Sequence, residues 1–322
     1  MFFPANLRFV DFHPKEENIR DMVVAGLQKT PKEIPAKLLY DKRGSELFDA
    51  ITRQPEYYQT RTELFLLERY GEEIGRLLGP RAMIIEFGSG HTRKIRRLFE
   101  CLEAQRCYMA VEISKEYLLQ SCSELAADFP SVDVIAVCAD FLRPFEPPPP
   151  KVSVRKRTVF FPGSTIGNFE PPTARRLLER AAAHVGKKGG LLIGVDLKKD
   201  KGVLEAAYND AARVTAEFEM NLLHRLNRDI ECDFALDGFE YLGFYAAERS
   251  RVEMYLVSKR EQRVQVGATQ FVFAPGERLH TENSYKFTVE EFQKFARGAG
   301  FCPREAWVDP DGLFSLHYLE VL

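Results

Sequence analysis

Short apolar segments alternate with helical segments between residues 81 and 197, and this alternation constrains the fold more than any other feature of the sequence. Such alternation at this spacing predicts a parallel sheet whose strands are joined by right-handed crossover helices. The expected strands are RAMIIEFG (81–88), CYMAVEIS (107–114), VDVIAVCAD (132–140), RTVFFPG (157–163) and LLIGVDL (191–197).

The alternation stops on both sides of this region. The N-terminal part is helical in pattern, residues 203–230 predict one long amphipathic helix, and antiparallel strands follow it. A C-terminal helix, with Thr288 and Glu291 as a capping box, and two strands are expected to return to the sheet. We therefore expect one domain of residues 60–200 plus 286–322, and a second of residues 1–59 plus 201–285.

Composition excludes several classes of function. The 322 residues carry a net charge of −2, which gives no basic footprint for nucleic acid. The six cysteines form no CxxC pair and the six histidines no HExxH motif, so we expect no metal. The sequence has no signal-peptide pattern and no segment of transmembrane length, so we expect a cytoplasmic protein without a membrane partner. We also expect a monomer.

The first turn from strand to helix, EFGSGHTRK (86–94), indicates a nucleotide site. Gly88 and Gly90 allow the backbone to approach a ligand closely and to adopt torsion angles that other residues avoid. A dinucleotide fingerprint would need a third glycine at Arg93. The ExGxG pattern instead resembles the first motif of S-adenosylmethionine-dependent methyltransferases.

Acidic residues at the ends of the next two strands strengthen this interpretation. Glu112 ends the second strand, where a carboxylate can accept hydrogen bonds from both ribose hydroxyls. Asp140 ends the third strand and is followed by Phe141. By the same resemblance, Asp140 would bind the adenine amino group and Phe141 would cover the ring. The loop FFPGSTIGNFEPP (160–172) follows the fourth strand, at the edge where open α/β sheets bind ligands.

Longer motifs indicate a specific family within this class of enzymes. From about Lys37 to Leu316, the chain closely resembles the family of L-histidine Nα-methyltransferases of ergothioneine biosynthesis. The motifs that carry the resemblance are LLYDKRGSELFDAITRQPEYYQTRTE, EFGSGHTRKIRRL, FPGSTIGNFEP, GVDLKKD, AYNDAARVTAEFEMN, HTENSYKF and WVDPDGLFSL. The resemblance implies a class I methyltransferase (Rossmann-like) α/β sheet with a second, α+β substrate-binding domain. It also implies transfer of three methyl groups from S-adenosylmethionine, as co-substrate, to the α-amine of L-histidine, which gives hercynine.

The resemblance further implies two sets of site residues. Those expected around S-adenosylmethionine are Tyr40, Phe48, Gly88, Lys94, Glu112, Asp140 and Phe141. Those expected around the amino acid are Tyr57, Gly163, Asn168, Tyr208, Met254, Glu282 and Ser284. Tyr40, Gly163 and Asn168 would act at the reacting amine, Asn168 and Tyr208 would bind the carboxylate, and Glu282 and Ser284 would hold the imidazole nitrogens.

Simpler interpretations stay open for several of these residues. Tyr57, Tyr208, Met254 and Phe48 have the spacing of packing residues, and Asn168 could cap the helix that starts at Pro171 or stabilise a turn.

The sequence also departs from the family pattern. Asn283 replaces a small apolar residue and should point away from Glu282 and Ser284, because side chains alternate along an extended segment. Glu112 stands where Asp is also expected, His91 in the glycine turn is unusual, and the pattern AEFNxN reads AEFEMN.

Two other functions remain possible from the sequence. One is an Nα-methyltransferase for tryptophan or another aromatic amino acid, against which the pair Glu282 and Ser284 argues. The other is a non-catalytic sensor of S-adenosylmethionine or histidine.

Overall fold

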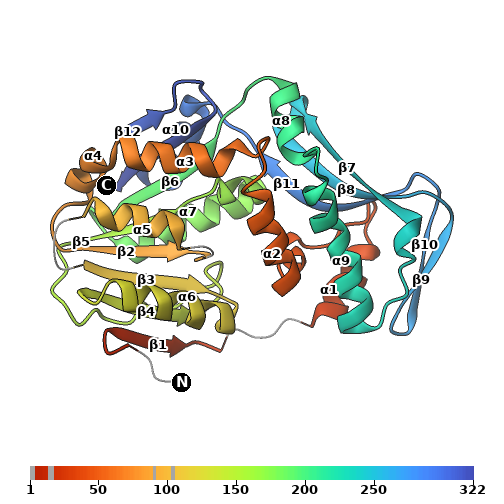
Figure 1. Cartoon of the computed structure of the whole chain (residues 1–322), viewed down its shortest axis with the longest axis horizontal. Helices are drawn as coiled ribbons and strands as arrows, with labels where there is room; N and C mark the ends of the chain where they lie inside the picture. The colour runs from red at the N-terminus through yellow and green to blue at the C-terminus, as the bar shows by residue number, and fades with distance from the viewer. Residues whose placement is uncertain (1–3, 14–17, 90–91, 103–105) are drawn as a thin grey trace. The chain divides into compact units, whose positions relative to one another are not determined.

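The chain folds into two units, which the computed structural model describes for residues 4–13, 18–89, 92–102 and 106–322 (Figure 1). Unit 1 comprises the described residues of Met1–Lys15, Arg61–Leu197 and Phe287–Leu322. Unit 2 comprises those of Glu16–Thr60 and Lys198–Lys286. None of the helices in the described ranges is long and apolar enough to cross a membrane.

Unit 1 is built on one sheet with the strand order β1-β4-β3-β2-β5-β6-β13-β12. Its strands are β1 (Leu7–Asp11), β2 (Ala82–Phe87), β3 (Arg106–Glu112), β4 (Val132–Cys138), β5 (Lys156–Phe161), β6 (Gly190–Asp196), β12 (Phe301–Val308) and β13 (Phe314–Val321). The five expected strands are confirmed as β2 to β6, which pair in parallel. The C-terminal segment returns to the sheet, because β13 pairs antiparallel with β6 and with β12 (Figure 1).

Helices cover both faces of this sheet and bury its apolar strands. The helices of unit 1 are the C-terminal part of α3 (Tyr58–Arg69), α4 (Gly71–Leu78), α5 (Arg93–Glu100), α6 (Lys115–Asp128), α7 (Pro171–Val185) and α10 (Val289–Arg297). Residues of α3 to α6 pack in one core cluster with the strands, and residues of α7 and α10 pack in another. Thr288 and Glu291 form the expected capping box of α10.

One N-terminal segment lies in a different unit from the one the sequence indicated. Residues 7–11 form β1, which pairs in parallel with β4 along its whole length and therefore belongs to unit 1. The local pattern of an isolated five-residue strand at a sheet edge carries no signal for its distant partner, because the register depends on long-range pairing.

Unit 2 combines helices with a three-stranded antiparallel sheet of order β11-β8-β7 and a β9–β10 hairpin. Its elements are α1 (Ile19–Leu27), the 3₁₀ turn η1 (Ala36–Leu39), α2 (Lys42–Ile51), α8 (Lys201–Tyr208), α9 (Val214–Ile230), the turns η3 (Leu236–Gly238) and η4 (Ala247–Arg249), β7 (Phe239–Ala246), β8 (Arg251–Ser258), β9 (Gln262–Val266), β10 (Thr269–Phe273) and β11 (Arg278–Tyr285). Helix α9 packs against α2 and against β7 and β8 (Figure 1).

The prediction of a single long helix over residues 203–230 was wrong, because the segment forms two helices, α8 and α9. Helix α8 ends at Tyr208, and Arg213 adopts a left-handed conformation with φ of 58° before α9 begins. The Asp210 carboxylate accepts hydrogen bonds from the amides of Val214 and Thr215, at 2.7 and 2.8 Å. These bonds satisfy two amides at the start of α9 that no helical carbonyl could reach.

Candidate active site

The parallel strands of unit 1 place most of the predicted cofactor residues at one edge of its sheet. Gly88 follows β2, Glu112 ends β3, and Asp140 comes two residues after β4. Gly163 follows β5. Because these strands run in parallel, their carboxyl ends meet at the same edge, which is where ligands of such sheets bind.

The turn after β2 has the backbone geometry that its glycine predicted. Gly88 has a φ of 68°, and its amide donates a hydrogen bond to the Val111 carbonyl at 2.9 Å. A Cβ atom at this position would lie 3.7 Å from the ring of Phe141. The other two residues singled out in this turn, Gly90 and His91, lie outside the described residues.

Backbone amides orient both acidic side chains at this edge. The Oε1 atom of Glu112 accepts from the amides of Ile113 and Ser114, at 2.8 and 3.0 Å. Burial raises the pKa of Glu112, while these two bonds counteract the rise. The Oδ1 atom of Asp140 accepts from the Leu142 amide at 2.8 Å. Both carboxylates are thus held in place before any ligand arrives.

Phe141 is part of an aromatic surface beside these acids. Its ring stacks on Phe87, with centroids 5.6 Å apart and planes 6° apart. It also makes edge contacts with Phe161 and Phe169, at 6.3 and 6.4 Å. This surface is suited to a flat apolar ring such as adenine, the role predicted for Phe141.

A buried carboxylate that sequence analysis missed connects two predicted site residues. Glu63 of α3 has no exposed surface, and its Oε2 atom lies 2.6 Å from the Lys94 ammonium. The Gly163 amide donates to both carboxylate oxygens of Glu63, at 2.9 and 3.1 Å. Gly163 itself has a φ of 81°, and a Cβ atom there would lie 3.2 Å from the Lys94 nitrogen. Glu63 therefore fixes the loop after β5 and the first turn of α5 together.

Asn168 ends the 3₁₀ turn η2 (Thr165–Asn168) and does not cap the following helix. The residue at the N-cap of α7 is Glu170, and no side-chain capping hydrogen bond is made at this position. Asn168 is therefore not the N-cap residue of α7, and it lies in a turn, as its alternative interpretation allowed. Its predicted bond to a substrate carboxylate stays a prediction.

In unit 2, four of the predicted residues form one aromatic cluster. Tyr40 at the end of η1 contacts Phe48 of α2, with ring centroids 5.7 Å apart. Phe48 contacts Tyr57 at 6.2 Å, and Tyr57 contacts Tyr208 at 6.5 Å. Phe218 of α9, which sequence analysis missed, lies 5.3 Å from Tyr40 and 6.1 Å from Phe48.

Three polar side chains alternate along the end of β11 and the residue after it: Glu282, Ser284 and Lys286. The Tyr40 hydroxyl donates to Glu282 at 3.4 Å, and the Tyr208 hydroxyl donates to Ser284 at 2.7 Å. Lys286, which sequence analysis missed, donates to Ser284 and to Tyr208, both at 2.8 Å, and is 1% exposed. Its position, four residues after Glu282 on an extended segment, was the signal that could have identified it.

The neighbours of Glu282 lie as the extended segment predicted. Asn283 points elsewhere, with its Oδ1 atom 2.9 Å from Nε2 of His280. Met254 is buried in β8 directly opposite Glu282 in the register, and its carbonyl accepts a hydrogen bond from Thr281 at 3.0 Å.

Burial dominates the electrostatics of this part of unit 2. It raises the pKa of Glu282 well above its usual range, and the charge of Glu219 raises it further, while Lys286 lowers it. Tyr40 is 38% exposed as a residue, but desolvation of its hydroxyl still raises its pKa, with the charge of Glu282 as the second cause. Tyr40 is therefore a neutral hydroxyl that donates hydrogen bonds at neutral pH, and not a tyrosinate base.

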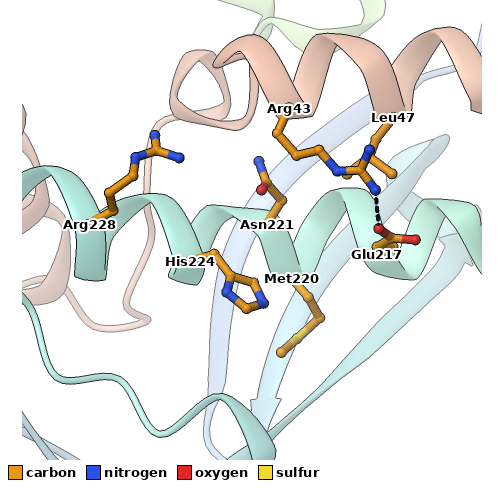
Figure 2. A pocket seen from close by; sticks show the side chains of 7 residues that line it. All are labelled: Arg43, Leu47, Glu217, Met220, Asn221, His224 and Arg228. Atoms are coloured by element: carbon orange, nitrogen blue, oxygen red, sulfur yellow. Dashed lines mark hydrogen bonds and ion pairs between the residues drawn. The ribbon is translucent and has the colours of Figure 1, made fainter.

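A pocket of about 300 Å³ lies elsewhere in unit 2, between α2 and α9 (Figure 2). Its lining residues are Arg43, Leu47, Glu217, Met220, Asn221, His224 and Arg228. Arg43 and Glu217 form an ion pair across it at 2.5 Å. None of the predicted site residues lines this pocket, and we assign it no part in the site.

The described residues contain no group of three or more His, Cys, Asp or Glu side chains that could hold a metal ion. The geometry instead offers an edge for a nucleotide-like ligand in unit 1, and a polar, aromatic-walled cluster in unit 2.

Comparison with known proteins identifies the family. Residues 19–321 match the model of the family described as "Histidine-specific methyltransferase, SAM-dependent". The chain belongs to this family. It is an S-adenosylmethionine-dependent methyltransferase, and its mostly parallel sheet, with antiparallel β13 inserted between β6 and β12, is that of the class I enzymes.

Individual relatives match over nearly the whole chain. The chain is 38% identical to a histidine N-alpha-methyltransferase of Mycolicibacterium smegmatis over 93% of this chain and 94% of that one. It is 36% identical to the protein of the same name in Mycobacterium tuberculosis, over 92% and 93%. Ergothioneine biosynthesis protein 1 of Neurospora crassa is 30% identical over 90% of this chain, which spans 33% of that protein.

Among solved structures, the chain is similar to a 1,6-didemethyltoxoflavin-N1-methyltransferase of Burkholderia thailandensis, with a TM-score of 0.46 and 12% identity. The match covers 87% of this chain and 88% of that one.

We predict that Glu63→Ala destabilises unit 1 by about 3–5 kcal/mol, the range measured when one partner of a buried ion pair is removed. The substitution leaves the Lys94 ammonium and the Gly163 amide without their shared acceptor. Urea unfolding followed by the fluorescence of Trp307, the single tryptophan of the chain and a residue of unit 1, measures the loss.

Glu68→Ala is the matched control, because Glu68 lies on the same helix with a side chain that is 65% exposed. Its removal should change stability by less than about 1 kcal/mol, as for other surface ion pairs. Equal effects of the two substitutions would contradict the role assigned to Glu63.

Glu86 of β2 predicts a pH dependence of stability. Burial raises its pKa from 4.5 to about 7, and it accepts a hydrogen bond from Tyr108. The folded state therefore holds a proton between about pH 4.5 and 7 that the unfolded chain has lost, so the free energy of unfolding falls as pH rises through this window.

We expect Glu86→Gln to remove this contribution, which is roughly 3 kcal/mol at most. Urea unfolding of the wild type and the variant at pH 5 and pH 8, again followed by Trp307, measures it. The same change in stability between the two pH values in both proteins would show that the folded-state pKa of Glu86 is not raised.

Proposed function

We propose that the protein transfers three methyl groups in succession from S-adenosylmethionine to the α-amine of L-histidine, and so makes the trimethylated betaine hercynine for ergothioneine biosynthesis. Membership of the histidine-specific family and the mycobacterial and fungal relatives support this function. The observation that carries it for this chain is the placement of Glu282 and Ser284 on β11, beside Tyr40 and Tyr208.

In this proposal, unit 1 binds the cofactor at the carboxyl edge of its sheet. Glu112 accepts the ribose hydroxyls, Asp140 accepts the adenine amino group, and Phe141 covers the ring. Gly88 allows the backbone to come close, and Lys94 contributes a positive charge for the carboxylate of the methionine part. The preoriented carboxylates of Glu112 and Asp140 support these roles.

The amino acid is anchored at both ends. Glu282 accepts a hydrogen bond from a ring N–H, while the Ser284 hydroxyl binds the other ring nitrogen. Asn168 and Tyr208 bind the carboxylate, and Tyr57 and Met254 bound the space around the amino acid.

The reaction itself requires mainly positioning. Transfer from a sulfonium to an amine disperses charge, and holding the reacting atoms about 3–3.5 Å apart and in line can supply roughly 7–11 kcal/mol. The α-ammonium must lose a proton before each transfer. Tyr40 orients the amine as a neutral donor and acceptor, since its raised pKa keeps it protonated, and Gly163 gives the amine room.

Three successive transfers require free space around the amine, while the carboxylate and the imidazole ring of the substrate stay bound. The aromatic faces of Tyr40 and Phe48 favour the cationic, methylated products, because a quaternary ammonium is attracted to an aromatic ring.

Incubation of the pure protein with methyl-labelled S-adenosylmethionine and each common amino acid tests the function directly. Transfer of three labels to histidine alone is expected. Transfer to tryptophan or another aromatic amino acid would replace histidine as the substrate, and binding without transfer would make the protein a sensor.

We predict that Glu282→Ala lowers the affinity for histidine by about 10–100-fold, the factor that a hydrogen bond to a charged group contributes. The affinity for S-adenosylmethionine should change far less. Isothermal titration with each ligand separates the two, and Asn283→Ala, one residue along the strand, is the matched control. Equal losses for both ligands would mean that Glu282 has a structural role only.

We predict that Asn168→Ala lowers kcat/KM for histidine by at least about tenfold, because the substrate carboxylate loses a hydrogen bond. The fold and the affinity for S-adenosylmethionine should be kept. Mass spectrometry of the three methylated products over time measures turnover. Near-native formation of the trimethylated product would rule out the carboxylate role of Asn168.

A further inference from the structure

A second carboxyl group, that of Glu219, is buried in the same unit as Glu282. It follows Phe218, whose ring contacts Tyr40, and the Tyr40 hydroxyl donates a hydrogen bond to Glu282. Glu219 belongs to α9 and has no exposed surface. Neither of its carboxylate oxygens has a hydrogen-bond partner among the described residues. This chain has Glu219 at the position where the quoted pattern AEFNxN has asparagine.

Neighbouring groups leave the charge of Glu219 uncompensated. The titratable groups whose pKa it influences are Tyr40, Tyr241 of β7 and Glu282 of β11. Each of these is neutral or negative. The Thr281 hydroxyl lowers the pKa of Glu219, but its proton is donated to the Met254 carbonyl.

The nearby donors are already in use. Tyr241 donates its hydroxyl proton to the Tyr208 carbonyl at 2.9 Å, and Lys286 donates to Tyr208 and Ser284. On α2, Arg43 pairs with Glu217, which lies two residues from Glu219 and therefore on another side of the helix. A buried carboxyl without a hydrogen-bond donor lowers the stability of the fold. A bound ligand is therefore the expected source of the donor.

We propose that Glu219 is a specificity-determining residue, and that it and Glu282 together bind the substrate side chain as a cation with two N–H donors, the imidazolium form of histidine. This inference rests on the proposed function and adds the ionisation state of the bound ring. A ring that carries both N–H groups gives each carboxylate a donor and supplies the positive charge that their burial requires. Glu219, and not Ser284, then binds the second ring nitrogen. A neutral ring has one N–H and leaves one of the two carboxyls unpaired or protonated.

The burial of Glu219 agrees with this. It raises the pKa of that carboxyl to about 7, close to the pKa of a free imidazole. A cation bound beside Glu219 lowers the pKa of the carboxyl and raises that of the ring, so both shifts favour the ion pair.

A histidine analogue with a ring that stays neutral tests the inference. In 1,2,4-triazolyl-alanine the ring has the size of imidazole, offers N–H and N groups, and gains a second ring proton only in strong acid. Its carboxylate and α-amine are those of histidine, so the ratio of the two affinities reports the ring alone. Isothermal titration at pH 7.5, with S-adenosylhomocysteine present, measures both ligands on the full chain.

We expect the wild type to prefer histidine by at least about tenfold, the lower limit for a hydrogen bond between charged groups. Glu219→Gln keeps the shape of the side chain and should lower this preference severalfold. Glu217→Gln, on the same helix but paired with Arg43, should leave it unchanged. Equal affinities of the wild type for both ligands, or the same preference in Glu219→Gln, would overturn the inference.

A measurement on the wild type alone tests the inference even if a variant fails to fold. Nitrogen-15 NMR of ring-labelled histidine bound at pH 8 should show both ring nitrogens protonated, and one bare nitrogen would overturn the inference. If the wild type methylates histidine but either result is negative, this inference fails and the proposed function stands. If it neither binds nor methylates histidine, both fail.

Discussion

The loop after β5 depends on one buried carboxylate. Glu63 accepts the Gly163 amide with both oxygens and pairs with the Lys94 ammonium, so a helix, a strand-end loop and the first turn of α5 share one anchor. A buried charge is tolerated only when it is paired and hydrogen-bonded, and Glu63 meets both conditions inside unit 1. Much of the carboxyl edge of the sheet is held in the same way, because Glu112 and Asp140 are also oriented by backbone amides.

Two buried carboxyls of unit 2, those of Glu219 and Glu282, have different surroundings. Glu282 has the Tyr40 hydroxyl beside it, at 3.4 Å, and Glu219 has no donor among the described residues. Burial raises the pKa of both. In unit 1, Glu63, Glu112 and Asp140 have their partners before a ligand binds, whereas in unit 2 the carboxyl of Glu219 creates a demand for a donor and a positive charge. This contrast suits a unit 1 that orients a cofactor and a unit 2 that selects an amino acid by its side chain.

The sequence predicted the sheet because its signals are local: apolar runs alternate with helical segments, and β2 to β6 follow them. It did not predict the partner of β1, since pairing across more than a hundred residues leaves no local pattern. The break between α8 and α9 depends on Asp210 capping amides that follow it, in a segment whose apolar periodicity continues without interruption. For the site, motif resemblance supplied Tyr40, Tyr208, Glu282 and Ser284, which the structure connects by hydrogen bonds. It did not single out Glu63, Glu219 or Lys286, although all three lie inside the quoted motifs, because the importance of each depends on burial and on partners distant in sequence.

The position of the bound ring tests the central claim most directly. A crystal structure with L-histidine and S-adenosylhomocysteine should show a ring nitrogen within hydrogen-bond distance of Glu282, with the amino acid's carboxylate at Asn168. A complex with Glu282 turned toward solvent, and with no amino acid beside Asn168, would contradict the account.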